Sequence, residues 1–361
     1  MQPHDYGTSL LVIVGAGASA GCLPEQMGAR PPLTKDLATR APLSNRLAVR
    51  YEQVQPLLDE LRERPTVEGP ETARAATVTL EEALRQYLER RTYDDNIARH
   101  VAAMRFYLRD LIWESTGAAL EADGGMTAYT RLVRRCYDWA ARNNSHVCFV
   151  NFNYDPMLEI ACAPHGLDRT TEAGYTSNPR LSVLKPHGSV LWAWRHPLVS
   201  PATGWNGDDA VRESIRAGEP TQQPSGEIAM RLQPPAFISE PGQSWVPLPA
   251  LALPVTGKGA FVWPPRHEAF FRAFHGRFGR VLTIGWQGAE EHFIPLLQPV
   301  VANGAQVLVV TGGNDAEQAE EDGHVVIANL GELAGRTRGG IFAGGFMNLG
   351  VEELEPILAP L

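Results

Sequence analysis

The hydrophobic positions of this chain follow different periods in different parts of the sequence. Short continuous apolar runs, typical of strands covered on both faces, occur at 9–14, 146–152, 181–185, 281–284 and 306–310. Between about residues 47 and 142, apolar side chains recur every three or four positions, as they do in amphipathic helices. Further helices are expected at 268–278 and around 293–297. The pattern predicts an α/β protein.

The helical stretch interrupts this alternation directly after the first strand. Its apolar sets at 54–61, 80–88 and 97–112 predict three helices. We therefore expect a doubly wound parallel sheet with a helical insertion after the first strand. The chain would form one domain over 1–361, in which segments of about 8–40, 144–200 and 250–361 build the sheet and 41–143 is inserted. The stretch 197–249, rich in Gly, Pro, Gln and Ser, is too long for an ordinary connector and is expected to be a functional or mobile loop region.

Composition excludes several classes of protein. The chain has 361 residues, of which 44% are hydrophobic and 20% charged, as in soluble globular proteins. The 41 acidic and 32 basic residues leave a net charge of -9, which argues against nucleic acid as the main partner. No apolar run approaches the roughly 18 residues that span a bilayer, which excludes an integral membrane protein.

The start of the chain imitates a secretion signal. The apolar run 10–14 is followed by the small residues 18–20 and by Cys22, but the first basic residue is Arg30, and Asp5 lies where a signal peptide carries positive charge. We interpret the run as a buried strand and expect a cytoplasmic protein.

The cysteines are scattered and form no C-x-x-C pair, which excludes a zinc ribbon and a dithiol redox centre. In a reducing compartment such residues are expected to be buried thiols. They are Cys22, Cys136, Cys148 and Cys162.

A glycine loop follows the first strand. Gly15-Ala16-Gly17-Ala18-Ser19-Ala20 satisfies the G-x-G-x-x-G/A pattern, in which glycines let the backbone approach a pyrophosphate. The alternative is a purely structural strand-to-helix turn. Asp36 lies near the distance at which a dehydrogenase carries its ribose-binding acid, but it does not end a strand. This departure argues against ordinary hydride transfer.

Polar residues also end the second and third predicted strands. Asn151-Phe152-Asn153-Tyr154-Asp155 allows two interpretations. Asp155 would N-cap a helix that has Pro156 at its first position, or the group would hold a ribose and a carboxamide. Both can hold at once, because a cap uses only part of the group. In Lys185-Pro186-His187-Gly188-Ser189, a tight turn would aim His187 into a cleft. An imidazole pKa of about 6.5 suits a general base, although a lone histidine is more often structural.

Together these motifs resemble the sirtuin superfamily, with Ile284-Gly285-Trp286 as a fourth matching piece. The resemblance covers the first 40 residues, about 145–195 and about 250–345. It is stronger to the bacterial sirtuin-like NAD-hydrolysing branch, many of whose members serve in antiphage defence. Features similar to that branch are Tyr154, Pro32-Leu33, and Leu253-Pro254 followed by Lys258. The four-cysteine zinc module of the protein deacetylases is lacking.

The resemblance implies a Rossmann-like NAD-binding domain and a set of residue roles. Asn153 would order the nicotinamide ribose and the attacking water, Asp155 would hold the carboxamide next to Tyr154, and His187 would be the general base. Gly285 and Trp286 would line the adenosine side, where Trp286 and Gln287 replace small hydroxyl residues of the family. The diphosphate would be held by Gly15, Ala16, Gly17 and Ser19, and the adenine ribose by Thr311 or Asn314.

The expected reaction is hydrolysis of NAD, as substrate, to nicotinamide and ADP-ribose, without a metal. The alternatives are an NAD-dependent protein deacylase, a non-catalytic NAD- or ADP-ribose-binding subunit of a larger complex, and last a dehydrogenase. The resemblance further implies self-association, or a partner ATPase or nuclease within a defence system that works by NAD depletion.

Overall fold

A computed structural model of the chain falls into two compact units. The first combines Met1–Pro31, Thr116–Gly188 and Trp263–Leu361, and the second combines Pro32–Ser115 and Ser189–Val262. Within them the structure describes residues 7–23, 43–62, 87, 96–122, 124–197, 206–218, 228–230, 238–240, 243–253, 262–288, 290, 292–312, 316–330 and 339–359.

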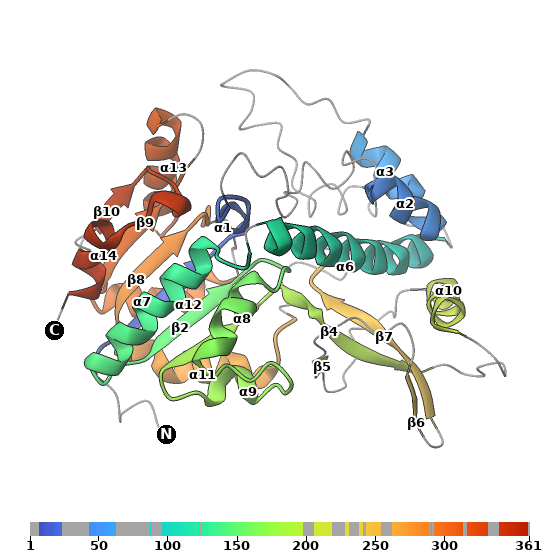
Figure 1. The fold of residues 1–361 in the computed structure, drawn as a ribbon, viewed down its shortest axis with the longest axis horizontal. Coiled ribbons are helices and arrows are strands. Elements are labelled where there is room, and N and C mark those ends of the chain that lie inside the picture. The colour runs from blue at the N-terminus through green and yellow to red at the C-terminus, as the bar shows by residue number, and fades with distance from the viewer. Residues whose placement is uncertain are drawn as a thin grey trace. The chain divides into compact units, whose positions relative to one another are not determined.

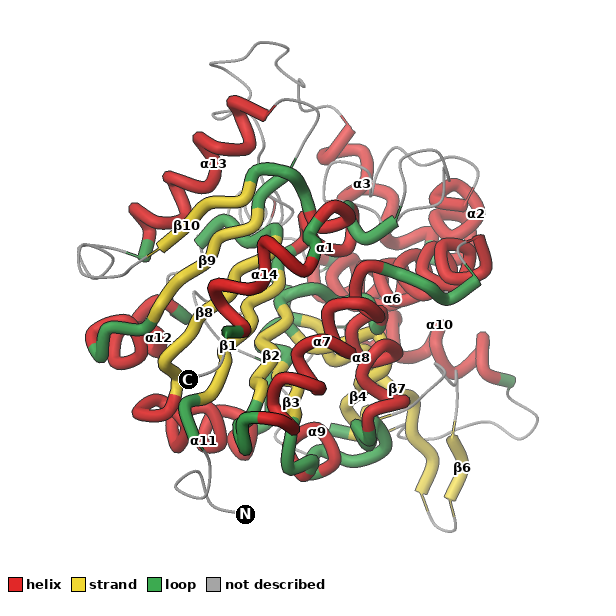
Figure 2. Tube along the Cα trace, turned by 60° about the vertical axis from the view of Figure 1, so that its left-hand side comes forward, coloured by secondary structure: helices red, strands yellow, loops and turns green. Residues whose placement is uncertain are grey.

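The first unit is built on a six-stranded sheet in which every strand runs parallel to its neighbours. The strands lie side by side in the order β10-β9-β8-β1-β2-β3 (Figure 2). Their bounds are β1 Ser9–Val14, β2 Val147–Asn151, β3 Leu181–Leu184, β8 Phe278–Ile284, β9 Gln306–Val310 and β10 Gly339–Phe342.

This strand order defines the fold. Counted along the chain within this sheet, the order is 3-2-1-4-5-6, which is that of the Rossmann fold. Right-handed crossovers then place the helices that follow β1 and β2 on one face and those that follow β8 and β9 on the other. All six residues of β1 are buried, as a central strand covered on both faces requires. The predicted doubly wound parallel sheet is confirmed.

The helices of the first unit connect these strands (Figure 1). α7 packs on β2, α13 packs on β9 and β10, and α14 returns to β8 and β9. Their bounds are α1 Ala16–Ala20, α7 Ala128–Arg142, α8 Met157–Cys162, α9 Gly174–Ser177, α11 Pro265–Phe274, α12 Ile294–Ala302, α13 Ala316–Asn329 and α14 Val351–Leu358. Short 3-10 turns lie at η5 Ala163–His165, η6 His275–Arg277 and η8 Phe346–Asn348.

The second unit combines helices with a four-stranded sheet of order β5-β4-β7-β6. Its strand pairs β4–β5 and β6–β7 are antiparallel. The elements are α2 Leu43–Arg50, η4 Glu52–Val54, α3 Gln55–Arg62, α10 Gly207–Ala217, β4 Gly188–Pro197, β5 Ala229–Met230, β6 Ile238–Glu240 and β7 Gln243–Leu251. The long helix α6, Ile97–Ala122, gives residues 97–115 to this unit and 116–122 to the first.

Several sequence predictions need correction. The expected loop region 197–249 contains α10, β5, β6 and most of β7. The prolines at 247 and 249 argue against a strand in the sequence of β7, because proline is normally confined to edge strands. The capping box of Asn206 and Asp209 starts α10 and was overlooked. The helix expected at 268–278 runs from Pro265 to Phe274, since Phe278 already begins β8.

The division into units also differs from the expected insertion of 41–143. Residues of that range up to Ser115 cluster with 189–262, whereas 116–143 cluster with the Rossmann-type sheet. The helix expected at 80–88 falls outside the described residues except for Tyr87, which is helical.

The four thiols are free and buried, as predicted. Among the described residues, no helix has both the length and the apolar character needed to cross a membrane.

Candidate functional site

The candidate site lies in the first unit, where β1 and β8 are neighbours. From β1 the chain moves outward to β2 and β3, whereas from β8 it moves the other way to β9 and β10. Such a switch of direction opens a crevice at the carboxyl ends of the strands, where doubly wound sheets bind ligands. Each motif singled out in the sequence follows one of these strand ends.

Glycine is required where the loops after β1 and β8 meet. The Gly15 N–H donates to Ile284 O at 3.0 Å, and the Gly17 N–H donates to Gly285 O at 3.1 Å. A Cβ atom at Gly15 would lie 2.5 Å from Gly285 O, and one at Gly285 would collide with the backbone of Gly17 and Ala18. Gly285 also has a left-handed φ of 55°. The glycines therefore serve close approach of two loops, while Ala16 and Gly17 themselves stay exposed.

Asn153 joins the loop after β2 to the glycine loop. Its side-chain Nδ2 donates to Gly15 O at 2.9 Å and to Ser19 Oγ at 2.7 Å. Because the Gly15 carbonyl can only accept, these contacts fix the orientation of the amide. Its backbone N–H donates to Asn151 Oδ1 at 2.9 Å. The carboxamide is only 6% exposed and is therefore held rigidly against the start of α1.

Asp155 has the capping use considered from the sequence. Its Oδ1 accepts from the Met157 N–H at 3.0 Å, which caps the first turn of α8. The N-cap position itself is Pro156, one residue later than expected. No described residue donates to the second oxygen, Oδ2. A cap thus uses one half of a carboxylate that is 4% exposed.

His187 lies in the turn between β3 and β4. The Gly188 N–H donates to Lys185 O at 3.0 Å, and Gly188 has a φ of 83°, which closes the turn. The imidazole packs edge-on against Phe152, with ring centroids 5.0 Å apart, and lies 6.3 Å from the ring of Tyr154. His187 and Tyr154 are both partly exposed. The histidine therefore neighbours the Asn153 loop.

Trp286 and Thr311 occupy the opposite side of the switch point. The indole of Trp286 is buried and stacks on Phe152 at 6.2 Å with an interplanar angle of 9°, and its Nε1 donates to Glu290. Thr311 Oγ1 donates to Ala319 O at 2.5 Å and is also buried. Both side chains thus have structural contacts. The residues Pro32, Leu33, Pro254, Lys258 and Asn314 lie outside the described part of the chain.

The sequence did not single out Tyr129 of α7, although it belongs to this network. Its hydroxyl lies 3.0 Å from Ser19 Oγ and 3.4 Å from Asn153 Nδ2. Burial, and then the nearby charge of Asp155, raises the pKa of this phenol well above its usual value, so it stays protonated. An amphipathic helix predicts that Tyr129 is buried, but not which residues it will meet.

The sequence motifs also do not reveal a buried ion pair beside the site. Lys185 Nζ lies 2.8 Å from Glu159 Oε1, and neither side chain is exposed at all. In the sequence, Lys185 belongs to the motif that carries His187. Its position at the end of an otherwise apolar strand was the available signal.

Within the described ranges, no cluster of three or more His, Cys, Asp or Glu side chains is arranged to hold a metal ion.

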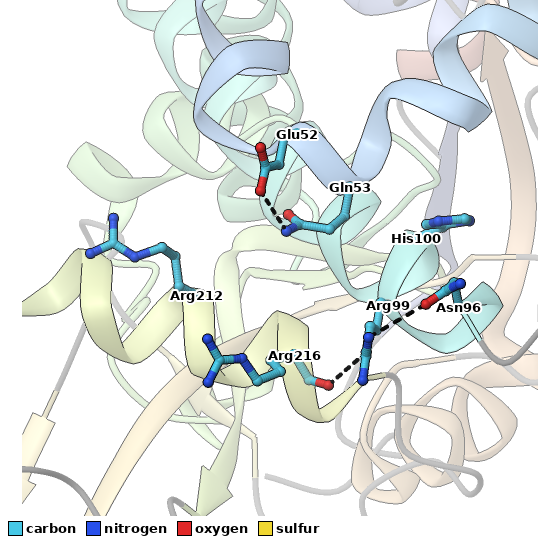
Figure 3. Close-up of a pocket in the computed structure, with 7 residues that line it drawn as sticks. All are labelled: Glu52, Gln53, Asn96, Arg99, His100, Arg212 and Arg216. Atoms are coloured by element: carbon cyan, nitrogen blue, oxygen red, sulfur yellow. Dashed lines mark hydrogen bonds between the residues drawn. The ribbon is translucent and has the colours of Figure 1, made fainter.

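A separate cavity of about 260 Å³ lies in the second unit. Figure 3 shows its polar lining, in which Arg99 donates to Arg216 O at 3.0 Å. Two of its arginines are paired with carboxylates outside the lining, Arg212 with Asp209 and Arg216 with Glu213. These pairs offset part of the positive charge of the lining. It consists of Glu52, Gln53, Asn96, Arg99, His100, Arg212 and Arg216.

Comparison with known proteins finds similar chains only at the level of three-dimensional structure. No family model matches the sequence, and no curated protein matches it. Solved structures of Sir2 homologues are its structural neighbours. A mutant Sir2 homologue in complex with 2'-O-acetyl ADP ribose is 13% identical, with a TM-score of 0.40, and the alignment covers 97% of this chain and 91% of that chain.

Two further neighbours score similarly. A Sir2 homologue–NAD complex is 12% identical at a TM-score of 0.38, over 97% of this chain and 89% of that one. A structure concerned with the mechanism and regulation of Sir2 enzymes is 12% identical at 0.33, over 91% and 93%. The strand order of the sheet by itself identifies the Rossmann-type fold.

Proposed function

We propose that the first unit binds NAD as a substrate and hydrolyses its nicotinamide glycosidic bond, giving nicotinamide and ADP-ribose. One observation carries the proposal. The amide of Asn153 is fastened to Gly15 and Ser19 of the glycine loop, while the imidazole of His187 packs on the neighbouring Phe152. This supports the proposal, because the loop that carries the amide of Asn153 and the carboxylate of Asp155 contacts both the glycine loop and the imidazole of His187.

The residues present fit a dinucleotide. Ala16 and Gly17 expose backbone that lacks bulky side chains, so a diphosphate could approach it closely. The Ser19 hydroxyl is only 3% exposed and already bonded to Asn153, which makes it a support for the loop rather than a primary phosphate ligand. Gly285, which is partly exposed, would line the adenosine side. The buried hydroxyl of Thr311 is engaged by Ala319, so a ribose contact there would need that bond to break.

The residue types suit hydrolysis at a pyridinium. The bond between the ribose C1' atom and the ring nitrogen breaks with its electron pair going to the nitrogen, so the leaving group departs neutral and needs no acid. Ordinary glycosidases, by contrast, use a pair of carboxyl groups. Water adds to C1' and loses one proton. The protein must therefore orient the leaving group, exclude bulk water and accept that proton.

Three side chains would divide these tasks. The Oδ1 atom of Asn153, opposite the amide nitrogen fixed on Gly15, would hold the ribose or the incoming water. Asp155 would hold the carboxamide through Oδ2, since Oδ1 caps α8. His187, partly exposed beside Phe152, would take the proton. None of these tasks calls for a metal.

The decisive experiment incubates purified protein with NAD and separates the products by chromatography. Wild-type protein should release nicotinamide and ADP-ribose in equal amounts without an acyl peptide. His187→Ala and Asn153→Ala should stay folded and lose turnover, whereas His324→Ala, an exposed histidine of α13, should keep it. Undiminished NAD consumption in both site variants would exclude the proposed chemistry.

The same assay separates the other candidate functions. Nicotinamide release only with an acyl-lysine peptide would indicate a deacylase. NAD binding without any product would indicate a non-catalytic NAD or ADP-ribose sensor, and formation of reduced nicotinamide would indicate a dehydrogenase.

We further propose that the activity is used by bacteria in antiphage defence, through NAD depletion, within a cytoplasmic homo-oligomer or together with a partner ATPase or nuclease. The support is the resemblance of the motifs to the sirtuin-like hydrolase branch. Cells expressing the protein should lose NAD on phage infection, and cells expressing His187→Ala should not. The molar mass in solution, measured by light scattering, tests self-association.

A further inference from the structure

Lys185 and Glu159 form an ion pair that is completely buried in the first unit. Lys185 follows β3, Glu159 lies in the first turn of α8, and Nζ and Oε1 are 2.8 Å apart. Burial raises the pKa of the Glu159 carboxyl, and the ammonium of Lys185 opposes that shift. Two charges have thus been removed from water next to the candidate site.

The ammonium group makes a second contact that a simple ion pair would not need. Lys185 Nζ donates to the backbone carbonyl of Asp155 at 2.6 Å. The ammonium therefore contacts both the loop after β2, at Asp155, and the helix α8 that follows it, at Glu159. The backbone carbonyl of Lys185 accepts from the Gly188 N–H and closes the turn that carries His187. Lys185 thereby connects the two loops on which the proposed chemistry depends.

Stability alone is a poor reason for this arrangement. Removing two charges from water is costly, and well-packed hydrophobic side chains of similar volume often stabilise a protein equally well or better. A pair that also bonds the backbone of Asp155 has an additional consequence, because it fixes the distance between two loops.

We propose that Lys185, held by Glu159, is a positioning residue that sets the His187 turn in register with the Asn153–Asp155 loop. The inference rests on the proposed function and names a buried residue pair that supports the two loops of the same site. Lys185 touches neither the substrate nor the reacting atoms. Its effect on turnover would pass through the placement of His187 and Asp155.

The test replaces the pair with uncharged side chains of similar size, Lys185→Met with Glu159→Leu. This double variant should retain its thermal unfolding midpoint, because no charge is left unpaired. Hydrogen exchange should nevertheless show lost protection at the amides of Asn153, Met157 and Gly188, which bond within the two loops. Amides of β1 and β9 should exchange as in wild type. Unchanged protection in both loops would overturn the proposal.

Kinetics add an independent reading of the same variant. Misplacement of the reacting groups should lower kcat roughly 100-fold with little change in KM. Glu159→Asp, which keeps a charged partner for Lys185, should retain more of kcat than the double variant. Glu268→Gln, which removes the exposed Glu268–Arg272 pair of α11, is the matched control and should have no effect.

The two hypotheses fail separately. If wild-type protein releases no nicotinamide but the double variant loses protection as described, the proposed function is wrong and the positioning role stands. If wild type is active and the double variant matches it in kcat and in exchange, the positioning role is wrong and the proposed function stands.

Discussion

The side-chain amide of Asn153 donates to the hydroxyl of Ser19 at 2.7 Å, across 134 positions of the sequence. Asn153 follows β2 and Ser19 lies in the short helix after β1, so the bond connects two strand ends that are neighbours in the sheet. The same amide nitrogen also donates to Gly15 O, which restricts rotation of the Asn153 side chain. The arrangement makes the candidate site rigid on this side.

Tyr129 should strengthen that rigidity from α7. Tyr129→Phe removes the hydroxyl that lies 3.0 Å from Ser19 Oγ and leaves the ring in its edge-on contact with Phe346. We expect a loss of about 1–2 kcal/mol in the free energy of unfolding, because the buried hydrogen bonds of this hydroxyl with Ser19 and Asn153 are lost. We also expect weaker binding of NAD. Urea unfolding and the KM for NAD measure the two effects.

Tyr137→Phe is the matched control, since Tyr137 lies on the same helix and packs beside His165. It should change neither quantity. Equal effects of the two substitutions would show that the Tyr129 hydroxyl has no special part in the site.

Gly285 should tolerate no side chain. Gly285→Ala would place a methyl group against the backbone of Gly17 and Ala18, in a left-handed conformation that already costs about 1–2 kcal/mol. The loops after β1 and β8 would have to separate. We expect the free energy of unfolding to fall by at least about 2 kcal/mol, and NAD binding to weaken with it. Differential scanning calorimetry and equilibrium binding of ADP-ribose measure these losses.

Gly276→Ala provides the comparison, because no atom lies within 4 Å of the added methyl group. That variant should behave like wild type. A stable Gly285→Ala protein with normal binding would mean that the two loops need not approach closely.

The parts of the fold that sequence patterns predicted well are those whose side chains have a single environment. β1 and β9 begin and end where their apolar runs do, because every residue of a central parallel strand faces either one helical layer or the other. The same logic located Asn153 and His187. A polar residue directly after such a run has to emerge at the carboxyl edge of the sheet.

The unpredicted parts depend on contacts between distant segments. β7 carries prolines at alternate positions, 247 and 249, so its sequence resembles a loop although its neighbours in the sheet make it a strand. Tyr129 has the spacing of an ordinary core residue of α7, and only the folded sheet brings it to Ser19. A lysine is normally expected at the surface, but Lys185 is buried because it pairs with Glu159.

The cysteines should be unreactive in the native protein. All four are buried, and burial raises the pKa of the Cys136 and Cys148 thiols to about 12, so almost no thiolate is present at neutral pH. Ellman's reagent should detect no fast-reacting thiol under native conditions and four after denaturation. One rapidly labelled thiol in the native state would contradict the burial of that residue.

Stability should fall as the pH drops below neutrality, because two histidines are buried in their neutral form. Burial lowers the pKa of His146 and of His267 from 6.5 to about 4. Between these values the unfolded chain binds the proton and the folded chain does not. Above about pH 7 neither histidine affects the pH dependence of stability. As the pH falls from 6.5 towards 4, each lowers the free energy of unfolding by up to about 1.4 kcal/mol per pH unit.

The measurement is the free energy of urea unfolding at pH 7, 6 and 5. His146→Gln should reduce this slope, whereas the exposed His324→Gln should leave it unchanged. Equal slopes in wild type and His146→Gln would show that His146 is protonated in the folded protein.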